Sequence, residues 1–275
     1  MNYRTIILLL LLSFTACVPY YRYKISDAPK NTKALDLSHS EKTSPPDDIF
    51  GFSQLTDIDL SDNPKMDWNM TFNKLVKVEK LHALFLNNNP HLNFKAVVDD
   101  LSVIKRLKYL SLANNNLRTL PDGIENLKSL EYVNLSNNAS IDIAETARRL
   151  SKLPNLKHVF VMNCGLEHLP REIFEIKSLE SLNVSGNNLD SLPDFSHLIN
   201  FNSLNISNNQ FRKIPDDLFH VEKRLNFEAS GNKITSIPNE ISNIKFHMFN
   251  LTNNSLSTEE MEKVKRLVKA RYKWY

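Results

Sequence analysis

The chain has 275 residues, of which 41% are hydrophobic, so it is long enough to bury a substantial core. Its 34 basic and 31 acidic side chains give a formal net charge of +3, which is too near balance to indicate a nucleic-acid or polyanion binder. Only 5 glycines occur and no GxGxxG or GxxxxGK[ST] string is present, so the sequence gives no indication of a nucleotide-binding loop.

The first 16 residues have the pattern of a secretory signal peptide. Arg4 gives a positively charged start, residues 5–12 form an apolar run, and the small residue Ala16 precedes Cys17. The apolar run is shorter than a membrane-spanning helix requires. We therefore expect residues 1–16 to direct the protein out of the cytoplasm.

Cys17 follows this run directly, and the arrangement resembles the lipobox of bacterial lipoproteins, in which the cysteine is acylated after cleavage. Phe14 departs from the pattern, because the family usually has leucine there. The resemblance implies lipid attachment at Cys17, a lipid-anchored tether over residues 17–31 and a location in the cell envelope. Val18 after the cysteine gives no inner-membrane retention signal, which implies the outer membrane of a bacterium. The alternative is an ordinary secretory signal followed by an incidental cysteine.

A nine-residue pattern, LxxLxLxx[NC], recurs in phase along residues 32–256, and one copy reads LKYLSLANN. The copies number about ten, and the first, weaker one ends at Ser40. The last positions of the others, which we call the asparagine ladder, are Asn63, Asn89, Asn115, Asn138, Cys164, Asn187, Asn209, Asn232 and Asn254. This series resembles the leucine-rich repeat family. The resemblance implies an α/β fold, a leucine-rich repeat solenoid shaped as a curved horseshoe with a parallel β-sheet on its concave face.

Alternation within each copy predicts a short strand. Leu110 and Leu112 point to one face and Tyr109 to the other, and strands stacked roughly 4.8 Å apart bury the leucines. Where the chain leaves the sheet, an asparagine side chain can bond backbone groups of its own coil, meaning one turn of the solenoid, and of the adjacent coil. Asn115 is therefore the structural residue of the run 114–116, and its loss would cost roughly 1–3 kcal/mol.

Cys164 occupies a ladder position at which the family also has cysteine. We interpret it as a buried thiol donor, with a reactive cysteine as the alternative. The chain has 2 cysteines, so Cys164 has no disulfide partner if Cys17 carries lipid.

The spacing of the ladder predicts two kinds of return on the convex side. Successive positions are 22, 23 or 26 residues apart. Shorter returns carry Leu-Pro or Ile-Pro pairs such as Leu120-Pro121, and proline there favours an extended or 3-10 path. Longer returns have apolar residues at helical spacing, which predicts helices within residues 68–81, 94–107 and 143–153.

Residues 257–275 are expected to form a C-terminal capping helix after the repeat domain of residues 32–256. Ser257 and Glu260 have capping-box spacing. An apolar face that would close the last coil consists of Met261, Val264, Val268 and Tyr272. The opposite side is basic, with Lys263, Lys265, Arg266, Lys269, Arg271 and Lys273. A structural envelope component that contacts anionic membrane or polysaccharide through this helix would have the same pattern, so it stays an alternative.

The sequence contains no catalytic constellation. Its 8 histidines are spread over different coils without an HExxH string, and no GxSxG motif occurs. We therefore expect no metal, no cofactor and no enzyme activity.

Outward-facing strand positions carry large rings in one half of the sheet. These positions, which we call the aromatic patch, are Phe85, Tyr109, Tyr132, His158 and Phe160. Rings on an open concave surface are typical of protein interfaces, because each buries a large area at small entropic cost. Alternatively, the rings reflect only the preference of aromatic residues for strands. We hypothesise a monomeric, non-enzymatic module that binds a protein or peptide partner on this face, with no nucleic-acid partner.

Overall fold

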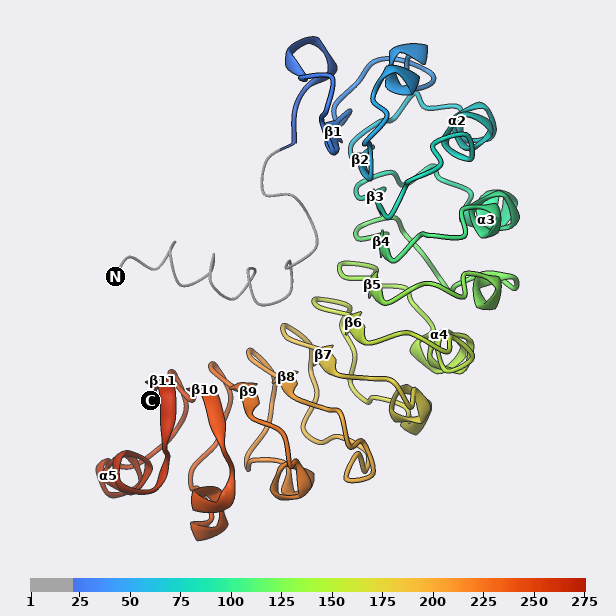
Figure 1. Ribbon diagram of the computed structural model, residues 1–275. Coiled ribbons are helices and arrows are strands. Elements are labelled where there is room, and N and C mark those ends of the chain that lie inside the picture. Colours follow the sequence, from blue (N-terminus) through green and yellow to red (C-terminus); the bar gives the residue numbers. More distant parts are fainter. Residues whose placement is uncertain (1–21) are drawn as a thin grey trace.

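The computed structural model describes residues 22–275, so the expected signal peptide and Cys17 lie outside the described residues. Within them, one parallel sheet of 11 strands runs in chain order along the inner side of an arc (Figure 1). The strands are Ala34–Asp36 (β1), Asp57–Asp59 (β2), Ala83–Phe85 (β3), Tyr109–Ser111 (β4), Tyr132–Asn134 (β5), His158–Phe160 (β6), Ser181–Asn183 (β7), Ser203–Asn205 (β8), Leu225–Glu228 (β9), Phe246–Asn250 (β10) and Ala270–Trp274 (β11).

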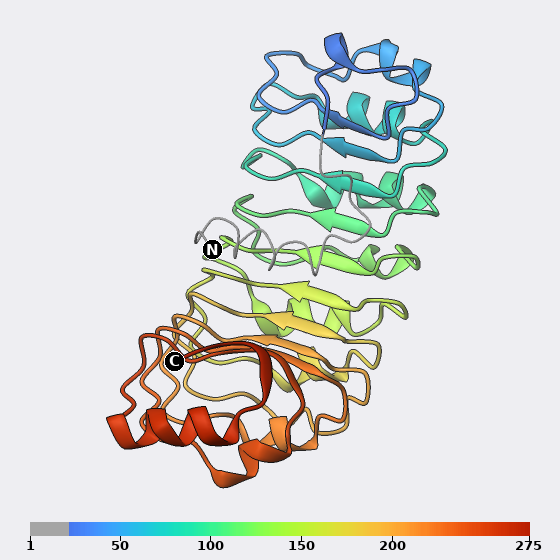
Figure 2. The ribbon, with the colours of Figure 1, turned by 60° about the vertical axis from the view of Figure 1, so that its left-hand side comes forward.

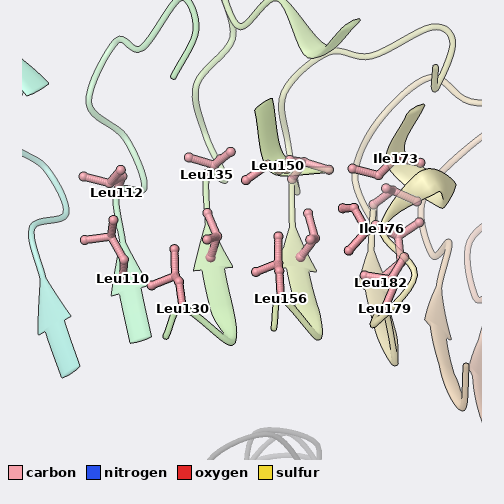
Figure 3. Packing of buried hydrophobic residues seen from close by; sticks show 14 of the residues in the cluster. Leu110, Leu112, Leu130, Leu135, Leu150, Leu156, Ile173, Ile176, Leu179 and Leu182 are labelled. Carbon is pink, nitrogen blue, oxygen red and sulfur yellow. The ribbon is translucent and has the colours of Figure 1, made fainter. Parts of the chain in front are cut away.

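The middle residue of each three-residue strand points into the core. From β4 to β7 the register places Leu110, Val133, Val159 and Leu182 side by side, and each is 0% exposed. Figure 3 shows leucines and isoleucines of successive coils packed between the sheet and the convex elements. Because every coil contributes the same positions, the core runs along the whole solenoid instead of forming one centre.

The convex side is mixed, as the ladder spacing predicts. The returns with 26-residue spacing contain the helices Trp68–Leu75 (α2), Phe94–Val103 (α3) and Ile143–Leu150 (α4). Most shorter returns contain a 3-10 helix: Asp47–Gly51 (η2), Ile124–Asn126 (η3), Arg171–Glu175 (η4), Asp216–His220 (η5) and Asn239–Asn243 (η6). The predicted horseshoe with a concave parallel sheet and a mixed helical and 3-10 convex side is confirmed.

Aspartates begin two of these helices. A side-chain oxygen of Asp67 accepts a bond from the Met70 backbone N–H at 2.9 Å, and Asp142 accepts one from the Glu145 backbone N–H at 2.9 Å. Helix α3 differs, because Asn93 precedes it and its side chain makes no cap bond. Each bonded aspartate satisfies a backbone donor that the helix itself cannot satisfy.

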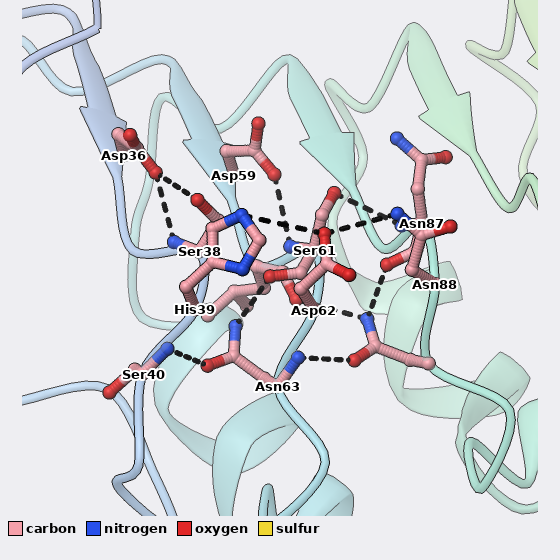
Figure 4. A network of polar contacts seen from close by, with 12 residues as sticks. Asp36, Ser38, His39, Ser40, Asp59, Ser61, Asp62, Asn63, Asn87 and Asn88 are labelled. Atoms are coloured by element: carbon pink, nitrogen blue, oxygen red, sulfur yellow. Dashed lines mark hydrogen bonds and ion pairs between the residues drawn. The ribbon is translucent and has the colours of Figure 1, made fainter.

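The asparagine ladder joins each coil to the one before it. The Asn115 Nδ2 donates to the Leu86 carbonyl at 2.9 Å, and its Oδ1 accepts from the Asn89 backbone N–H at 2.6 Å. The same two-way bridge to the preceding coil is made by Asn63, Asn89, Asn138, Asn187, Asn209, Asn232 and Asn254. Figure 4 shows the first step, in which Asn63 lies between Ser40 and the next coil.

Cys164 is the one ladder position from Asn63 to Asn254 without an amide. Its Sγ lies 3.5 Å from the Leu135 carbonyl and 3.4 Å from the Met162 carbonyl. Burial raises the pKa of the thiol, while the backbone N–H groups of Asn138 and Asn137 act in the opposite direction. This is the geometry of a buried thiol donor, and it gives no support to a reactive cysteine.

The residue before each ladder position has a left-handed backbone. Its φ lies between 53° and 71° at His39, Asp62, Asn88, Asn114, Asn137, Asn163, Gly186, Asn208, Gly231 and Asn253. Among residues other than glycine, asparagine and aspartate adopt this region most readily. The run 114–116 therefore divides its tasks: Asn114 makes the turn and Asn115 bonds the preceding coil. The left-handed requirement was not part of the sequence prediction.

Neighbouring turn residues contact one another in two ways. Near the start of the solenoid their side chains bond: Asn88 donates to Asp62 at 3.0 Å and Asn114 donates to Asn88 at 2.8 Å. Further along, the Asn163 side chain lies over Gly186, where a Cβ atom would be only 1.9 Å from the Asn163 Oδ1. Glycine is required there both by the positive φ and by the approach of the amide.

The segment predicted as a tether is folded onto the first coil from Arg22 onward. The Tyr23 N–H donates to the Ala34 carbonyl at 3.1 Å, and the Asp36 N–H donates to the Tyr23 carbonyl at 2.8 Å. A 3-10 turn, Ile25–Asp27 (η1), follows. This part of residues 17–31 belongs to the folded domain, because it pairs with backbone groups that β1 would otherwise expose at the sheet edge.

The C-terminal segment also differs from its prediction. Helix α5 (Thr258–Leu267) begins at Ser257, whose Oγ accepts from the Glu260 N–H at 3.2 Å, but residues 270–274 form β11, parallel to β10. A helix through residue 275 is therefore wrong, since the final residues pair with the sheet. Val264 and Val268 are 0% and 1% exposed, so α5 does cover the last coil, at the end of the stack in Figure 2.

Candidate binding surface on the concave face

The concave face is formed by the first and third residues of the strands, because the middle residue points into the core. The register aligns Tyr109, Tyr132 and His158 in one row across β4–β6. The next row places Phe160 two strands away from Ser111, with Asn134 between them. Large side chains therefore meet on three adjacent strands.

Four of the five predicted residues are in contact through their rings. The centroid of Tyr132 lies 5.6 Å from that of Tyr109, 6.4 Å from that of His158 and 4.8 Å from that of Phe160. These distances are those of favourable tilted aromatic pairs. Tyr132 is thus the centre of the aromatic patch.

The exposure of these rings is uneven. Tyr109, Tyr132 and His158 are half-buried, but Phe160 is only 8% exposed, so its expected contribution as an exposed ring is wrong. Burial raises the pKa of Tyr132 to about 12, so its phenol stays neutral, and burial also lowers the pKa of His158. Around neutral pH the centre of the patch therefore presents neutral rings and not charges.

Phe85 is held by a contact that the sequence did not indicate. The Arg22 Cζ lies 4.0 Å from the centroid of the Phe85 ring, and the Arg22 Nη1 is 3.1 Å from the Asp59 carboxylate. Asp57 lies on the same face. Burial raises its pKa to about 6, although the hydrogen bond from the Thr56 hydroxyl and the charge of Arg22 both act to lower it. The structure therefore assigns Phe85 to a polar cluster at the start of the sheet.

Alternating charges flank the aromatic patch, just before the same strands begin. The Lys108 Nζ lies 2.7 Å from Glu131, and the Lys157 Nζ lies 3.6 Å from Glu131 and 3.7 Å from Glu180. The residues are partly exposed, so these ion pairs contribute little to stability. They give the edge of the patch a regular pattern of both signs.

Polar residues occupy the concave face of β7, β8 and β9, and their row continues to Asn250 of β10. The side chains of Asn183, Asn205 and Asn250 each accept a bond from the backbone N–H two residues further on, at 3.1, 2.9 and 3.0 Å. These amides therefore shape the turn that follows each strand. The exception in the same row is Glu228, which is 6% exposed.

Residues 22–275 hold no group of three or more histidine, cysteine, aspartate or glutamate side chains suited to a metal ion. None of the helices in this part of the chain has the length and apolar character to cross a membrane.

A curved, open parallel sheet with short helical returns and a bonded asparagine in nearly every turn defines a solenoid repeat protein. The sequence profile described as "Leucine Rich repeats (2 copies)" matches residues 105–146, and that described as "Leucine rich repeat" matches residues 154–211. The chain is a leucine-rich repeat protein.

Two solved structures are similar to this chain. An internalin (InlF) from Listeria monocytogenes is similar with a TM-score of 0.59 at 21% identity, over 84% of this chain and 64% of the internalin chain. A leucine-rich repeat protein of Leptospira interrogans matches with a TM-score of 0.43 at 18% identity, over 92% of this chain and 100% of its own. At 21% identity the likeness to the internalin concerns the fold. No curated protein sequence matches the chain significantly.

Proposed function

We propose that this protein is a non-enzymatic binding module whose concave face holds a protein or peptide partner outside the cytoplasm. The observation that carries the proposal is the contact of Tyr109, Tyr132 and His158 on three adjacent strands of an open, curved sheet. Such rings bury a large area at small entropic cost and form the centres of interfaces. Leucine-rich repeat proteins generally bind protein partners, which agrees with this reading of the surface.

The arrangement fits an elongated partner segment that crosses the strands. The rings lie side by side along the direction of strand stacking, and the ion pairs from Lys108 to Glu180 run parallel to them. A partner segment that lies on the rings would place its polar groups against this charged edge. Neutral rings at the centre and charges at the rim are the usual anatomy of a protein interface.

The test is cross-linking capture of envelope proteins by the full chain, compared with the double variant Tyr109→Ala, Tyr132→Ala. We expect a captured protein to be lost with the double variant and kept with the convex control Phe50→Ala, Val103→Ala, which removes two exposed apolar side chains. Thermal melts of both variants establish that they fold. Equal capture by the folded double variant would disprove the assigned surface.

We further propose that lipid on Cys17 anchors the protein in the cell envelope, on the outer membrane. The support is the sequence pattern that ends at this residue. Cells fed an azido fatty acid should label the parent protein and not the Cys17→Ser variant, and the label should follow the outer-membrane fraction. Label that persists in the Cys17→Ser variant would exclude this anchor.

The alternative role of the basic C-terminal residues receives less support. The Lys273 Nζ donates to the carbonyls of Lys265 and Val268 at 3.4 and 3.2 Å, Lys263 donates to the Ile237 carbonyl, and Lys265 pairs with Glu262. The Lys263 bond fastens α5 to the preceding coil, whereas the bonds of Lys273 and Lys265 lie within the C-terminal segment. The Glu262 carboxylate offsets the charge of Lys265, and the other two ammonium groups are already engaged by backbone carbonyls.

A further inference from the structure

Strand β9 carries two hydrogen-bond acceptors on the concave face that no described residue satisfies. Glu228 is 6% exposed, and its Oε2 accepts from the Asn250 Nδ2 at 2.8 Å. The Glu228 Oε1 and the Asn226 Oδ1 are buried and have no hydrogen-bond partner among residues 22–275. The two residues are separated by one position in the strand, so both side chains lie on the same face. Unsatisfied buried acceptors are uncommon in folded proteins and call for an explanation.

No cation of the described chain neutralises Glu228. Strand β8 presents Ser203 and Asn205 beside it, and neither side chain is charged. Burial raises the pKa of Glu228 to about 7, and the bond from Asn250 is the only influence that lowers it. A buried carboxylate without a counter-ion is costly, so an external cation would be bound favourably there.

The charged groups of the next strands are directed elsewhere. The Arg271 Cζ lies 5.4 Å from the ring centroid of Tyr272, and Lys273 donates to carbonyls at the end of α5. His247 lies with its ring 5.7 Å from that of Tyr272. These are the titratable and charged side chains of β10 and β11, and none of them forms an ion pair with Glu228.

Two aromatic rings lie on the same face two strands further on, in β11. The register pairs Tyr272 with Met248 and Trp274 with Asn250, so both rings share the concave face with Asn250 and hence with Glu228. Their planes are inclined by only 11°, with centroids 6.3 Å apart. Parallel aromatic faces next to a carboxylate favour a flat cation, because the ring face and the acid both attract positive charge.

We propose that the concave surface of β9–β11 is a binding site for a guanidinium group, namely an arginine side chain of the protein partner. Guanidinium offers five N–H donors in a plane, which suits the Glu228 Oε1 and the Asn226 Oδ1 while the plane lies against Trp274. An ammonium group lacks this planar shape and is more strongly hydrated. This inference rests on the proposed function, and it names the chemistry of the partner at one end of the sheet.

The site is tested by NMR with the full chain and two short probes, the peptide acetyl-Gly-Arg-Gly-amide and its citrulline counterpart. Citrulline has the same shape as arginine but no charge. The chain has 2 tryptophans, so the indole N–H of Trp274 reports the site and that of Trp68, on convex helix α2, is an internal reference. We expect saturable shifts of Trp274 with the arginine peptide only. Equal shifts with both peptides, or equal shifts of both indoles, would overturn the proposal.

Variants locate the effect. Glu228→Gln removes the charge, keeps an acceptor for Asn250 and should weaken arginine-peptide binding at least about tenfold. Glu240→Gln is the control, because it removes an exposed carboxylate on the convex 3-10 helix η6, away from the concave face, and it should bind the peptide as the parent does. Unchanged binding by folded Glu228→Gln would also overturn the proposal.

Failure of this inference can be told from failure of the proposed function. If Tyr109→Ala, Tyr132→Ala loses the captured partner while Glu228→Gln binds the arginine peptide normally, the guanidinium site is wrong and the binding module stands. If the arginine peptide binds at Glu228 but capture is unaffected by any concave variant, the site stands and the proposed function is wrong.

Discussion

In the ladder turns from Asn63 to Asn254, except that of Cys164, one amide side chain satisfies backbone groups of the preceding coil. Asn115 gives a donor to Leu86 and an acceptor to Asn89, both of which lie in the preceding coil. Alanine would leave the buried Asn89 N–H without its acceptor, while the Leu86 carbonyl would keep only the bond from the Asn89 side chain. A buried group without a partner costs more than the bond itself contributes. The energetic importance of this residue therefore exceeds that of an ordinary surface bond.

For Asn115→Ala we expect the free energy of unfolding to fall by about 1–3 kcal/mol, measured by urea titration. Asn116→Gly is the control. Asn116 is exposed with a φ of 54°, a conformation that glycine adopts easily, so it should change the free energy by less than about 0.5 kcal/mol. Similar losses for both substitutions would contradict the role of the ladder.

Glu228 makes the stability depend on pH. Its folded pKa of about 7 lies above the ordinary 4.5, so between these values the folded state keeps a proton that the unfolded state has released. The free energy of unfolding therefore falls as pH rises through this window.

Glu228→Gln should remove this loss. We expect the variant to exceed the parent by on the order of 1–3 kcal/mol at about pH 8 and to equal it near pH 4, measured by urea titration. Asp57, whose pKa is raised to about 6, adds its own dependence of the free energy of unfolding on pH, and this dependence is the same in both proteins. A constant difference at all pH values would show that Glu228 is not the titrating group.

At the scale of the element, the three convex helices differ in the residue that directly precedes their first turn. Asp67 and Asp142 bond the first turn of α2 and α4, whereas Asn93 does not bond that of α3. Aspartate and asparagine are both residue types that commonly cap helices. The difference gives a matched comparison within one chain.

We expect Asp142→Ala to lower the free energy of unfolding by about 1 kcal/mol, because the Glu145 N–H loses its acceptor. Asn93→Ala should have a smaller effect, since no cap bond is lost. Equal effects of the two substitutions in chemical denaturation would show that general helix propensity, and not the cap bond, determines the result.

The spacing of the ladder positions predicted the convex helices, but it did not predict the last strand, β11. The 26-residue steps leave enough chain for a helix, and α2, α3 and α4 lie within the predicted ranges. After α5, Val268 and Tyr272 continue a helical period, while residues 270–274 alternate with period two. Residues 270–274 form a strand because they pair with β10. Pairing with a distant segment cannot be predicted from the pattern of a short segment alone.

Across the whole molecule, each coil contacts chiefly its neighbours, so disturbances should stay local. The buried Cys164 thiol is a probe of the centre of the stack, since a labelling reagent reaches it only when the structure around β6 opens. Val264, a residue of α5 at the far end of the stack, is 0% exposed.

In a Cys17→Ser background, Val264→Asp should accelerate amide hydrogen exchange in β10 and β11 without changing the rate at which Cys164 is labelled. The physical reason is that no single core joins the two regions. Alkylation and hydrogen exchange followed by mass spectrometry measure both rates. If Cys164 labelling accelerates as much as exchange at the end, the solenoid opens as one cooperative unit.

The part of the candidate surface that depends only on strand register could be predicted from the sequence. Identical copies place Tyr109, Tyr132 and His158 in one row, so their contact follows from the repeat. The contact of Arg22 with Phe85 depends on a segment outside the repeat, and no pattern in the sequence indicates it. Likewise, the guanidinium site needs Trp274 on a strand that was expected to be helical.

The approach of Asn163 to Gly186 limits how such a solenoid can be lengthened. Asp62, Asn88 and Asn114 link to one another through side chains, so duplicating the segment between two of these residues preserves matching neighbours at both new junctions. A duplicate placed before Gly186 would instead bring a side chain into the space that the Asn163 amide fills. Modular extension is therefore favoured in the first half of the chain and blocked at this junction, where the order of the modules is fixed.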